Sequence, residues 1–204
     1  MDERARPLLE DDLEADPLRQ FERWFEDAAG AVRVPEAMAL ATASADGVPS
    51  VRMVLLKRFD ADGLVFHTNY ESRKGLELAA NGRAAALLYW DPLGRQVRVE
   101  GTVERVSRAE SEAYFRTRPR AAQISASVSQ QSKRVESRDE LEARRDTLER
   151  DLDGGDVRPP ESWGGYLLRP ESWEFWQHRE DRFHDRLRYS RADSGGWRVE
   201  RLQP

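Results

Sequence analysis

The sequence contains no cysteine and only three histidines among its 204 residues. Without cysteine, disulfides, thiolate catalysis and cysteine-based zinc sites are excluded. The histidines, at positions 67, 178 and 184, form no pair at i, i+4 spacing, so we expect no metal site. There is no run of about 18 apolar residues and no apolar N-terminal segment. We therefore expect neither a membrane span nor a secretory signal, with a cytoplasmic location as the default.

Common nucleotide-binding and hydrolase motifs are also missing. The chain has no G-x-G-x-x-G, no G-x-x-x-x-G-K-[ST] and no G-x-S-x-G. The net charge of −5 arises from interspersed acidic and basic residues, which argues against a nucleic-acid partner. What is present is bulky core material: six Trp, seven Phe and five Tyr, enough for one well-buried domain.

Helix signals occur at four places in the chain. Residues 1–15 are acidic and aperiodic, and we expect a mobile arm there, followed by a single domain over residues 16–204. A helix begins at Asp16-Pro17. A short helix follows Ser72, and its pattern predicts that Leu76 and Ala79 face inward. Capping boxes begin two further helices after residues 107 and 137, and the second of these helices spans 138–152.

Strand signals surround these helices. Alternating or apolar runs bounded by turn residues predict strands over 38–43, 51–59, 64–68, 84–90, 96–106, 163–168, 173–177, 184–191 and 197–202. Helix, strands, helices and strands in that order indicate an α+β fold with a closed antiparallel barrel, and not βαβ units.

Basic side chains beside these strands are the first candidates for chemistry. Arg52 and Lys57 bracket an apolar strand at odd spacing, so on a regular strand they point to opposite faces. Arg73 and Lys74 follow the capping Ser72 at a helix start, where free N–H groups already favour an anion, and they predict a phosphate pocket. The alternative is that these cations are solvated surface charges.

A second cationic group lies near the C-terminus. Strand alternation puts Arg182, His184 and Arg186 on one face, where they repel one another unless an anion lies between them. A surface strand with an outward charged face is the competing interpretation. Gln96, Gln131 and Ser132 are neutral polar groups suited to the edges of a heterocycle, and Trp176 taken alone fits ordinary core packing.

Taken together, these segments resemble the pyridoxamine 5'-phosphate oxidase family. The resemblance runs from about Asp16 to the C-terminus and is carried by Arg52-Met-Val-Leu-Leu-Lys57, Ser72-Arg-Lys74, Gly94-Arg-Gln96-Val, Tyr114-Phe-x-x-Arg118-Pro-Arg, Gln131-Ser132, Trp163-Gly-Gly165, Glu174-Phe-Trp-Gln177 and Arg182-Phe-His-Asp-Arg186. It implies an FMN-binding split β-barrel of antiparallel Greek-key type with flanking helices. It also implies a homodimer, with FMN at the subunit interface held by residues of both chains.

The resemblance further implies roles for individual residues. The FMN contacts would be Arg52, Met53, Val54, Leu55, Leu56, Lys57, Thr68, Arg73, Lys74, Gln96, Gln131, Ser132, Trp176 and Arg186. The substrate 5'-phosphate would meet Lys57, Tyr114 and Arg118. Arg182 and His184 would cover the pyridine ring as the catalytic pair. The implied reaction is oxidation of pyridoxamine or pyridoxine 5'-phosphate by O2 to pyridoxal 5'-phosphate, with release of hydrogen peroxide, and of ammonia from the amine.

Four features depart from the family pattern. His67 stands where the family usually has Tyr or Phe, Ala122 replaces a phosphate-binding Ser, and His178-Arg179 replaces a stretch that usually contains Gly. The arm also lacks an Arg-x-x-Tyr segment. Two other functions stay open: a flavin oxidase of the same fold, as in phenazine biosynthesis, and a non-catalytic flavin- or pyridoxal-phosphate-binding protein. The retained substrate-binding residues favour a phosphorylated B6 vitamer.

Overall fold

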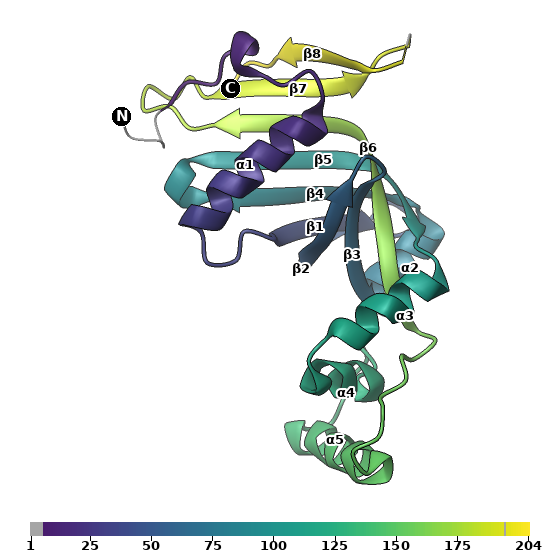
Figure 1. The fold of residues 1–204 in the computed structure, drawn as a ribbon. Helices are drawn as coiled ribbons and strands as arrows, with labels where there is room; N and C mark the ends of the chain where they lie inside the picture. Colours follow the sequence, from purple (N-terminus) through teal and green to yellow (C-terminus); the bar gives the residue numbers. More distant parts are fainter. Residues whose placement is uncertain (1–5, 194) are drawn as a thin grey trace.

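An eight-stranded antiparallel sheet forms the body of the computed structural model, which describes residues 6–193 and 195–204. The strand order is β3-β2-β1-β4-β5-β6-β7-β8, and an additional pairing of β3 with β6 closes the first six strands into a barrel (Figure 1). The strands are β1 (Ala37–Ala43), β2 (Pro49–Asp60), β3 (Gly63–Asn69), β4 (Arg83–Trp90), β5 (Arg95–Arg105), β6 (Trp163–Gln177), β7 (Asp185–Arg191) and β8 (Trp197–Arg201). The closed antiparallel barrel predicted from the sequence is confirmed.

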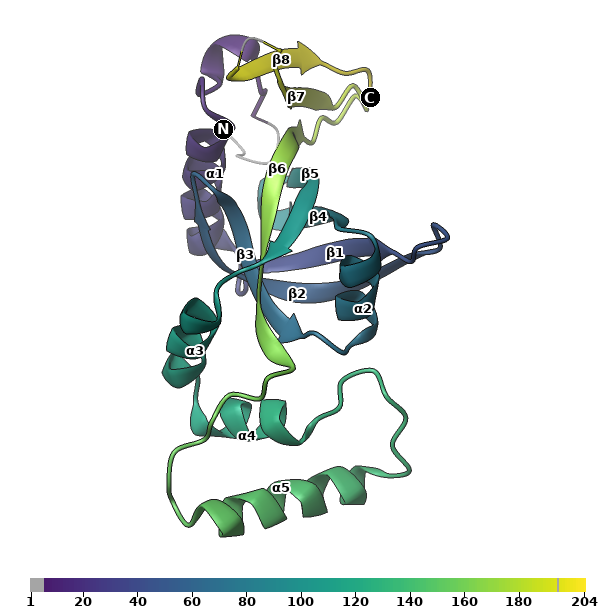
Figure 2. The same ribbon diagram turned by 90° about the vertical axis from the view of Figure 1, so that its right-hand side faces the viewer.

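The helices lie around this barrel. Long helix α1 (Pro17–Ala31) crosses one face of the sheet, and α2 (Arg73–Ala80) lies beside β1. The other helices, α3 (Arg108–Thr117), α4 (Arg120–Val128) and α5 (Arg138–Leu152), form an extension below the barrel (Figure 2). Two 3-10 turns complete the described elements, η2 (Glu10–Asp12) and η3 (Asp91–Leu93).

Aromatic residues fill the core between α1 and the barrel. Phe21 and Trp24 of α1 are buried against the sheet, where Phe21 contacts the rings of Trp90 and Trp173 and Trp24 meets Phe175 edge-on. Burial of side chains this large contributes about 2–3 kcal/mol each, so the apolar stripe of α1 fixes the helix on the sheet.

Strand β6 differs from the prediction. The sequence indicated two strands, 163–168 and 173–177, but the structure has one strand of 15 residues. A register shift between β5 and β6 leaves Glu171 of β6 as an extra residue, next to Pro170, which lies opposite Gly101. The lower half of β6 pairs with β3 and the upper half with β7, so this strand joins the barrel to the C-terminal sheet.

Helix α2 also faces differently from the prediction. Its bounds and its Ser72 cap agree, but Leu76 and Ala79 are exposed, whereas Lys74, Glu77 and Leu78 are buried. The polar residues point inward because they find hydrogen-bonding partners: Glu77 on β1 and β2, 35 and 27 positions away, and Lys74 on β3, which directly precedes the helix.

The described part of the predicted N-terminal arm contacts the C-terminal strands. Leu8 is buried, and its amide donates to Asp185 at 3.1 Å. Arg201 forms an ion pair with Glu10 at 2.7 Å. Residues 1–5 of the predicted arm lie outside the described residues. Within the described ranges, no helix combines the length and apolarity needed to cross a membrane.

Candidate active site

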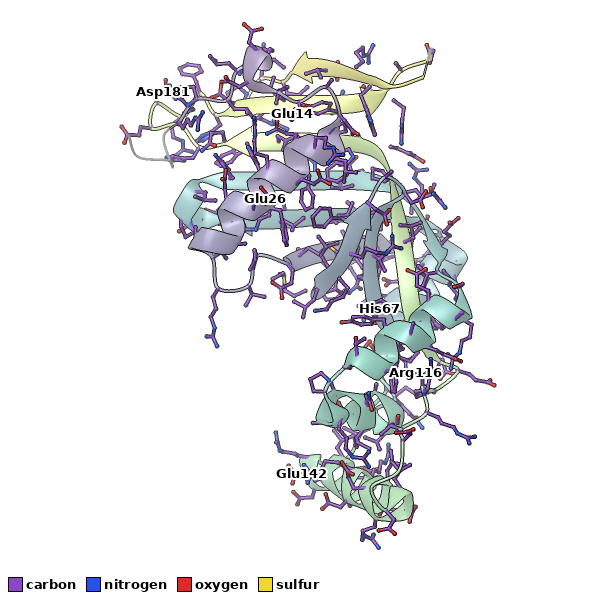
Figure 3. All side chains as sticks on the ribbon, viewed as in Figure 1. Glu14, Glu26, His67, Arg116, Glu142 and Asp181 are labelled. Atoms are coloured by element: carbon purple, nitrogen blue, oxygen red, sulfur yellow. The ribbon has the colours of Figure 1, made fainter. Side chains whose placement is uncertain are left out.

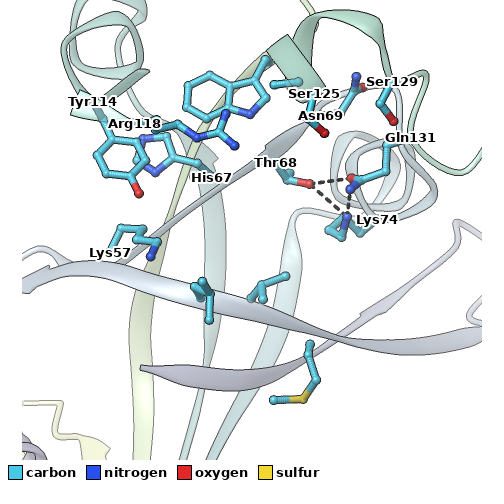
Figure 4. Close-up of a pocket in the computed structure, with 15 residues that line it drawn as sticks. Lys57, His67, Thr68, Asn69, Lys74, Tyr114, Arg118, Ser125, Ser129 and Gln131 are labelled. Carbon is cyan, nitrogen blue, oxygen red and sulfur yellow. Dashed lines mark hydrogen bonds between the residues drawn. The ribbon is translucent and has the colours of Figure 1, made fainter. Parts of the chain in front are cut away.

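A pocket of about 300 Å³ opens where β2 and β3 face α3, α4 and the segment after α4 (Figure 4). The predicted site residues that line it are Met53, Val54, Leu55, Lys57, Thr68, Lys74, Tyr114, Arg118 and Gln131. Segments up to 110 positions apart in sequence therefore meet here, counting from Met53 to Trp163. The remaining lining includes His67, Trp163 and the hydroxyl residues Ser125 and Ser129.

Lys74 forms one end of the pocket. Its Nζ donates to Thr68 Oγ1 at 2.9 Å and to Gln131 Oε1 at 2.8 Å (Figure 4). Among residues 6–193 and 195–204 it has no carboxylate partner. Burial, and then the charge of Arg52, lower the pKa of Lys74 to about 8. An ammonium that is buried without a counter-ion, in the first turn of α2, suits a bound anion.

Arg52 and Arg73 lie behind this end and do not line the pocket. Both are held by Glu77, whose carboxylate accepts from Arg73 Nε at 2.8 Å and from Arg52 Nη2 at 3.3 Å. It also accepts from the hydroxyls of Thr42 and Ser50, each at 2.5 Å. These hydrogen bonds outweigh burial and lower the pKa of Glu77 to about 2. Sequence reasoning missed Glu77, although its i+4 spacing from Arg73 was visible.

Lys57, Tyr114 and Arg118 form the other end of the pocket. Lys57 is the extra residue at a register shift of β2 between Leu56 and Arg58, and it lines the pocket whereas Arg52 does not. The Arg118 guanidinium lies 4.9 Å from the Trp163 ring centroid, and its buried Nη1 has no partner among the described residues. Burial lowers the pKa of Arg118 and raises that of Tyr114.

His67 forms the wall beside Arg118. Its ring stacks on Tyr114, with centroids 4.1 Å apart, and on Trp163 at 5.2 Å. Both ring nitrogens are buried and have no hydrogen-bond partner in the described parts of the chain. Burial, followed by the charges of Arg118 and Lys57, lowers the pKa of His67 to about 4, so the ring is neutral at pH 7. The sequence marked His67 as unusual but did not indicate that Trp163 packs against it.

The other predicted site residues lie elsewhere. Ser132 adjoins Gln131 with a left-handed φ of 73°, and Leu56 points into the core. Gln96, Trp176 and Arg186 are neighbours across β5, β6 and β7, and Arg186 Nε donates to Glu174 at 2.8 Å. These three residues form a second group with Arg182 and His184. This second group lies at the end of β6 that is farther from the pocket. Figure 3 shows the separation, with His67 at the lower end of the barrel and Asp181 beside the C-terminal strands.

The alternation argument for Arg182 and His184 was wrong. Strand β7 begins at Asp185, and both residues lie in the turn before it. Arg182 has a left-handed φ of 70°, so no strand face relates it to Arg186.

Two family models match the chain. Residues 25–149 match the pyridoxamine 5'-phosphate oxidase model, and residues 163–204 match the pyridoxine 5'-phosphate oxidase C-terminal dimerisation region. The chain belongs to the pyridoxamine 5'-phosphate oxidase family. Curated relatives of this family cover nearly all of it. The pyridoxine/pyridoxamine 5'-phosphate oxidase of Rubrobacter xylanophilus is 57% identical over 97% of this chain and 91% of its own. That of Bordetella pertussis is 52% identical over 97% and 93%.

Two solved structures share the fold of this chain. PhzG from Burkholderia lata, in complex with tetrahydrophenazine-1-carboxylic acid, superposes with a TM-score of 0.92 at 35% identity, covering 98% of this chain and 100% of that one. A pyridoxamine 5'-phosphate oxidase-related, FMN-binding protein from Nostoc punctiforme gives a TM-score of 0.75 at 20% identity, covering 94% and 100%. The second likeness supports the fold.

Proposed function

We propose that the chain is an FMN-dependent oxidase that uses O2 to convert pyridoxamine and pyridoxine 5'-phosphates to pyridoxal 5'-phosphate, with release of hydrogen peroxide. The relatives named pyridoxine/pyridoxamine 5'-phosphate oxidase, at 52–57% identity over almost the whole chain, support this proposal. So does one observation in the site: a single pocket has two separate cationic ends.

The two cationic ends of the pocket predict that it binds two anionic groups. Lys74 is at one end and Lys57 with Arg118 at the other. Val54 and Leu55 of β2 also line the pocket. None of these three cations has a carboxylate partner in the described structure. Uncompensated cations in a half-buried site raise the free energy unless anions bind there. Two phosphate esters, one from FMN and one from the vitamer, fit this pattern.

FMN binding is proposed at the Lys74 end. Lys74, Thr68 and Gln131 supply an ammonium, a hydroxyl and an amide at hydrogen-bonding distance of one another, which suits a phosphate and the polar edge of a flavin. The full proposed set of contacts is Arg52 to Lys57, Thr68, Arg73, Lys74, Gln96, Gln131, Ser132, Trp176 and Arg186. When bound, FMN supplies the hydride acceptor and its reoxidation by O2.

The vitamer is proposed to bind at the Lys57 end. Lys57, Tyr114 and Arg118 hold its phosphate, and this remote binding energy fixes the position of the reacting carbon. The aromatic wall of His67 and Trp163 excludes water from the Arg118 side of the pocket. Arg182 and His184 are proposed to cover the pyridine ring.

A homodimer is proposed because, within one chain, the pocket residues and the second group of site residues lie at different ends of β6. The match to a dimerisation region over residues 163–204 supports this assembly. So does an apolar stripe on β2, in which the exposed fractions of Val51, Met53 and Leu55 are 67%, 63% and 42%. In this arrangement the second group of one copy covers the pocket of the other. Residues 16–204 act as one oxidase domain, located in the cytoplasm.

Oxidation of a phenazine precursor is the second candidate, favoured by the TM-score of 0.92 to PhzG. Anaerobic addition of pyridoxamine 5'-phosphate to the FMN-loaded protein separates the candidates. The visible flavin band is expected to bleach, and to recover with peroxide when air enters. Pyridoxamine without phosphate is the matched control, and it is expected to bleach the band at least about tenfold more slowly. A protein that binds no FMN, or whose FMN stays oxidised, would contradict the proposal.

A further inference from the structure

The turn between β6 and β7, residues 178–184, is held by its own hydrogen bonds. The amide of Arg182 donates to Arg179 O at 3.2 Å, and the amide of Phe183 donates to Asp181 Oδ1 at 3.0 Å. These bonds hold Arg182 in its left-handed conformation, which is unfavourable for a residue with a Cβ. The backbone of the turn therefore has a defined conformation.

His184 is fixed by the same turn. The backbone N–H of Arg179 donates to His184 Nδ1 at 3.0 Å. A backbone amide can only donate here, so Nδ1 must carry a lone pair, and the proton of the neutral ring must be on Nε2. The His184 ring packs against the ring of Trp176, with centroids 4.6 Å apart, and against the ring of His178, with centroids 5.3 Å apart.

The surroundings also oppose the doubly protonated ring. A proton on Nδ1 would face the Arg179 N–H and remove that hydrogen bond. Burial, followed by the charges of His178 and Arg182, lowers the pKa of His184, while Asp181 and Asp185 act in the opposite direction with smaller effect. The neutral ring with its proton on Nε2 is the favoured form.

We infer that His184 is a hydrogen-bond donor of fixed tautomer, which presents Nε2–H to an oxygen acceptor of the substrate and does not accept a proton from it. Arg179 is then a positioning residue that acts through its main chain. This inference rests on the proposed function, in which His184 reaches the vitamer. The rival role is that of a general base, which needs a free lone pair at the outward nitrogen.

Two substitutions separate the donor role from a structural one. In His184→Gln the amide nitrogen replaces Nε2, so the outward donor is kept and the bond from Arg179 is lost. In His184→Asn the side chain reaches only the Nδ1 position, so the amide oxygen can keep the Arg179 bond while the outward donor is lost. The donor role predicts a KM for pyridoxamine 5'-phosphate within about threefold of wild type for Gln, and at least about tenfold higher for Asn, as for Ala.

Other results would overturn the inference. A structural role gives the reverse order, with Asn better than Gln, and a general base gives an equal loss of kcat in Gln, Asn and Ala with little change in KM. FMN affinity, measured by flavin fluorescence, is expected to stay unchanged in all three variants. If wild-type protein fails to reduce FMN with the vitamer, the proposed function fails instead.

Nitrogen NMR of protein labelled with ¹⁵N-histidine tests the tautomer without substrate or turnover. The His184 signals, assigned by their loss in His184→Gln, are expected to show a bonded proton on Nε2 and none on Nδ1 from pH 6.5 to 8. A proton on Nδ1 would overturn the inference even if the enzyme proves active on the vitamer.

Discussion

At the scale of single residues, the pocket contains a histidine that behaves as an aromatic spacer. His67 stacks on Tyr114 and Trp163 and has no hydrogen bond among the described residues. The neighbouring cations Arg118 and Lys57 disfavour its charged form. A Phe would provide the same stacking surface without a titrating group.

His67→Phe is therefore expected to reduce the acid sensitivity of the fold. The pKa of the histidine is about 6.5 in the unfolded chain and about 4 in the folded one, so the unfolded state binds the extra proton between these values. Its contribution to stability is complete above pH 6.5 and is lost as the pH falls toward 4. Urea unfolding of the apoprotein at pH 7 and pH 5 should show a smaller loss of unfolding free energy in the variant. An equal loss in both proteins would contradict this role.

At the scale of elements, the start of β6 is constrained by close packing. A Cβ at Gly164 would overlap the hydroxyl of Tyr70 and come within 2.9 Å of Ser111 Oγ. Both neighbours are themselves tied to β6, because Tyr70 donates to Gly165 O and Ser111 accepts from Gly165 N. The Trp163-Gly-Gly165 motif thus lets β6 pass close to α3 and places Trp163 at the pocket.

Gly164→Ala is expected to destabilise the protein by about 1–3 kcal/mol through overpacking. Gly30→Ala is the matched control, because a Cβ at Gly30 in α1 has no atom within 4 Å and Ala favours a helix by up to about 1 kcal/mol. Chemical denaturation should therefore shift the two midpoints in opposite directions. A neutral Gly164→Ala would mean that Tyr70 moves aside at no cost.

The elements differ in how far the sequence determines them. Helix α5 was predicted with its observed bounds because its capping interaction is local: Ser137 Oγ accepts from Glu140 N at 3.1 Å. The continuity of β6 and the buried face of α2 were not predicted, since both depend on strands distant in sequence. The same holds in the site. The family resemblance indicated Lys74 and Gln131, whereas the bonds of Glu77 to β1 and β2 and the packing of Trp163 on Arg118 arise from tertiary structure.

At the scale of the whole molecule, the proposed dimer depends on the apolar stripe of β2. Val51 has an exposed fraction of 67% and does not line the pocket. Val51→Glu would bury a carboxylate in the proposed interface and is expected to weaken dimerisation by about 100-fold or more. Val34→Glu, at an exposed site before β1, is the control and should leave the dimer intact. Analytical ultracentrifugation measures both, and an unchanged dimer in Val51→Glu would place the interface elsewhere.

Strand β6 carries Trp163 near one end and Trp176 near the other, 13 residues apart. At about 3.3 Å per residue this is roughly 40 Å of continuous, hydrogen-bonded strand. Apart from the register shift opposite Gly101, its pairing with β5 continues from Tyr166 to Gln177, so we expect that a solitary copy does not fold its own second group over its own pocket. If the proposed dimer is the active unit, the fraction of active enzyme depends on protein concentration. Dilution below the dissociation constant of the dimer then removes activity while each chain remains folded. Ligands that bind across the two copies restore it.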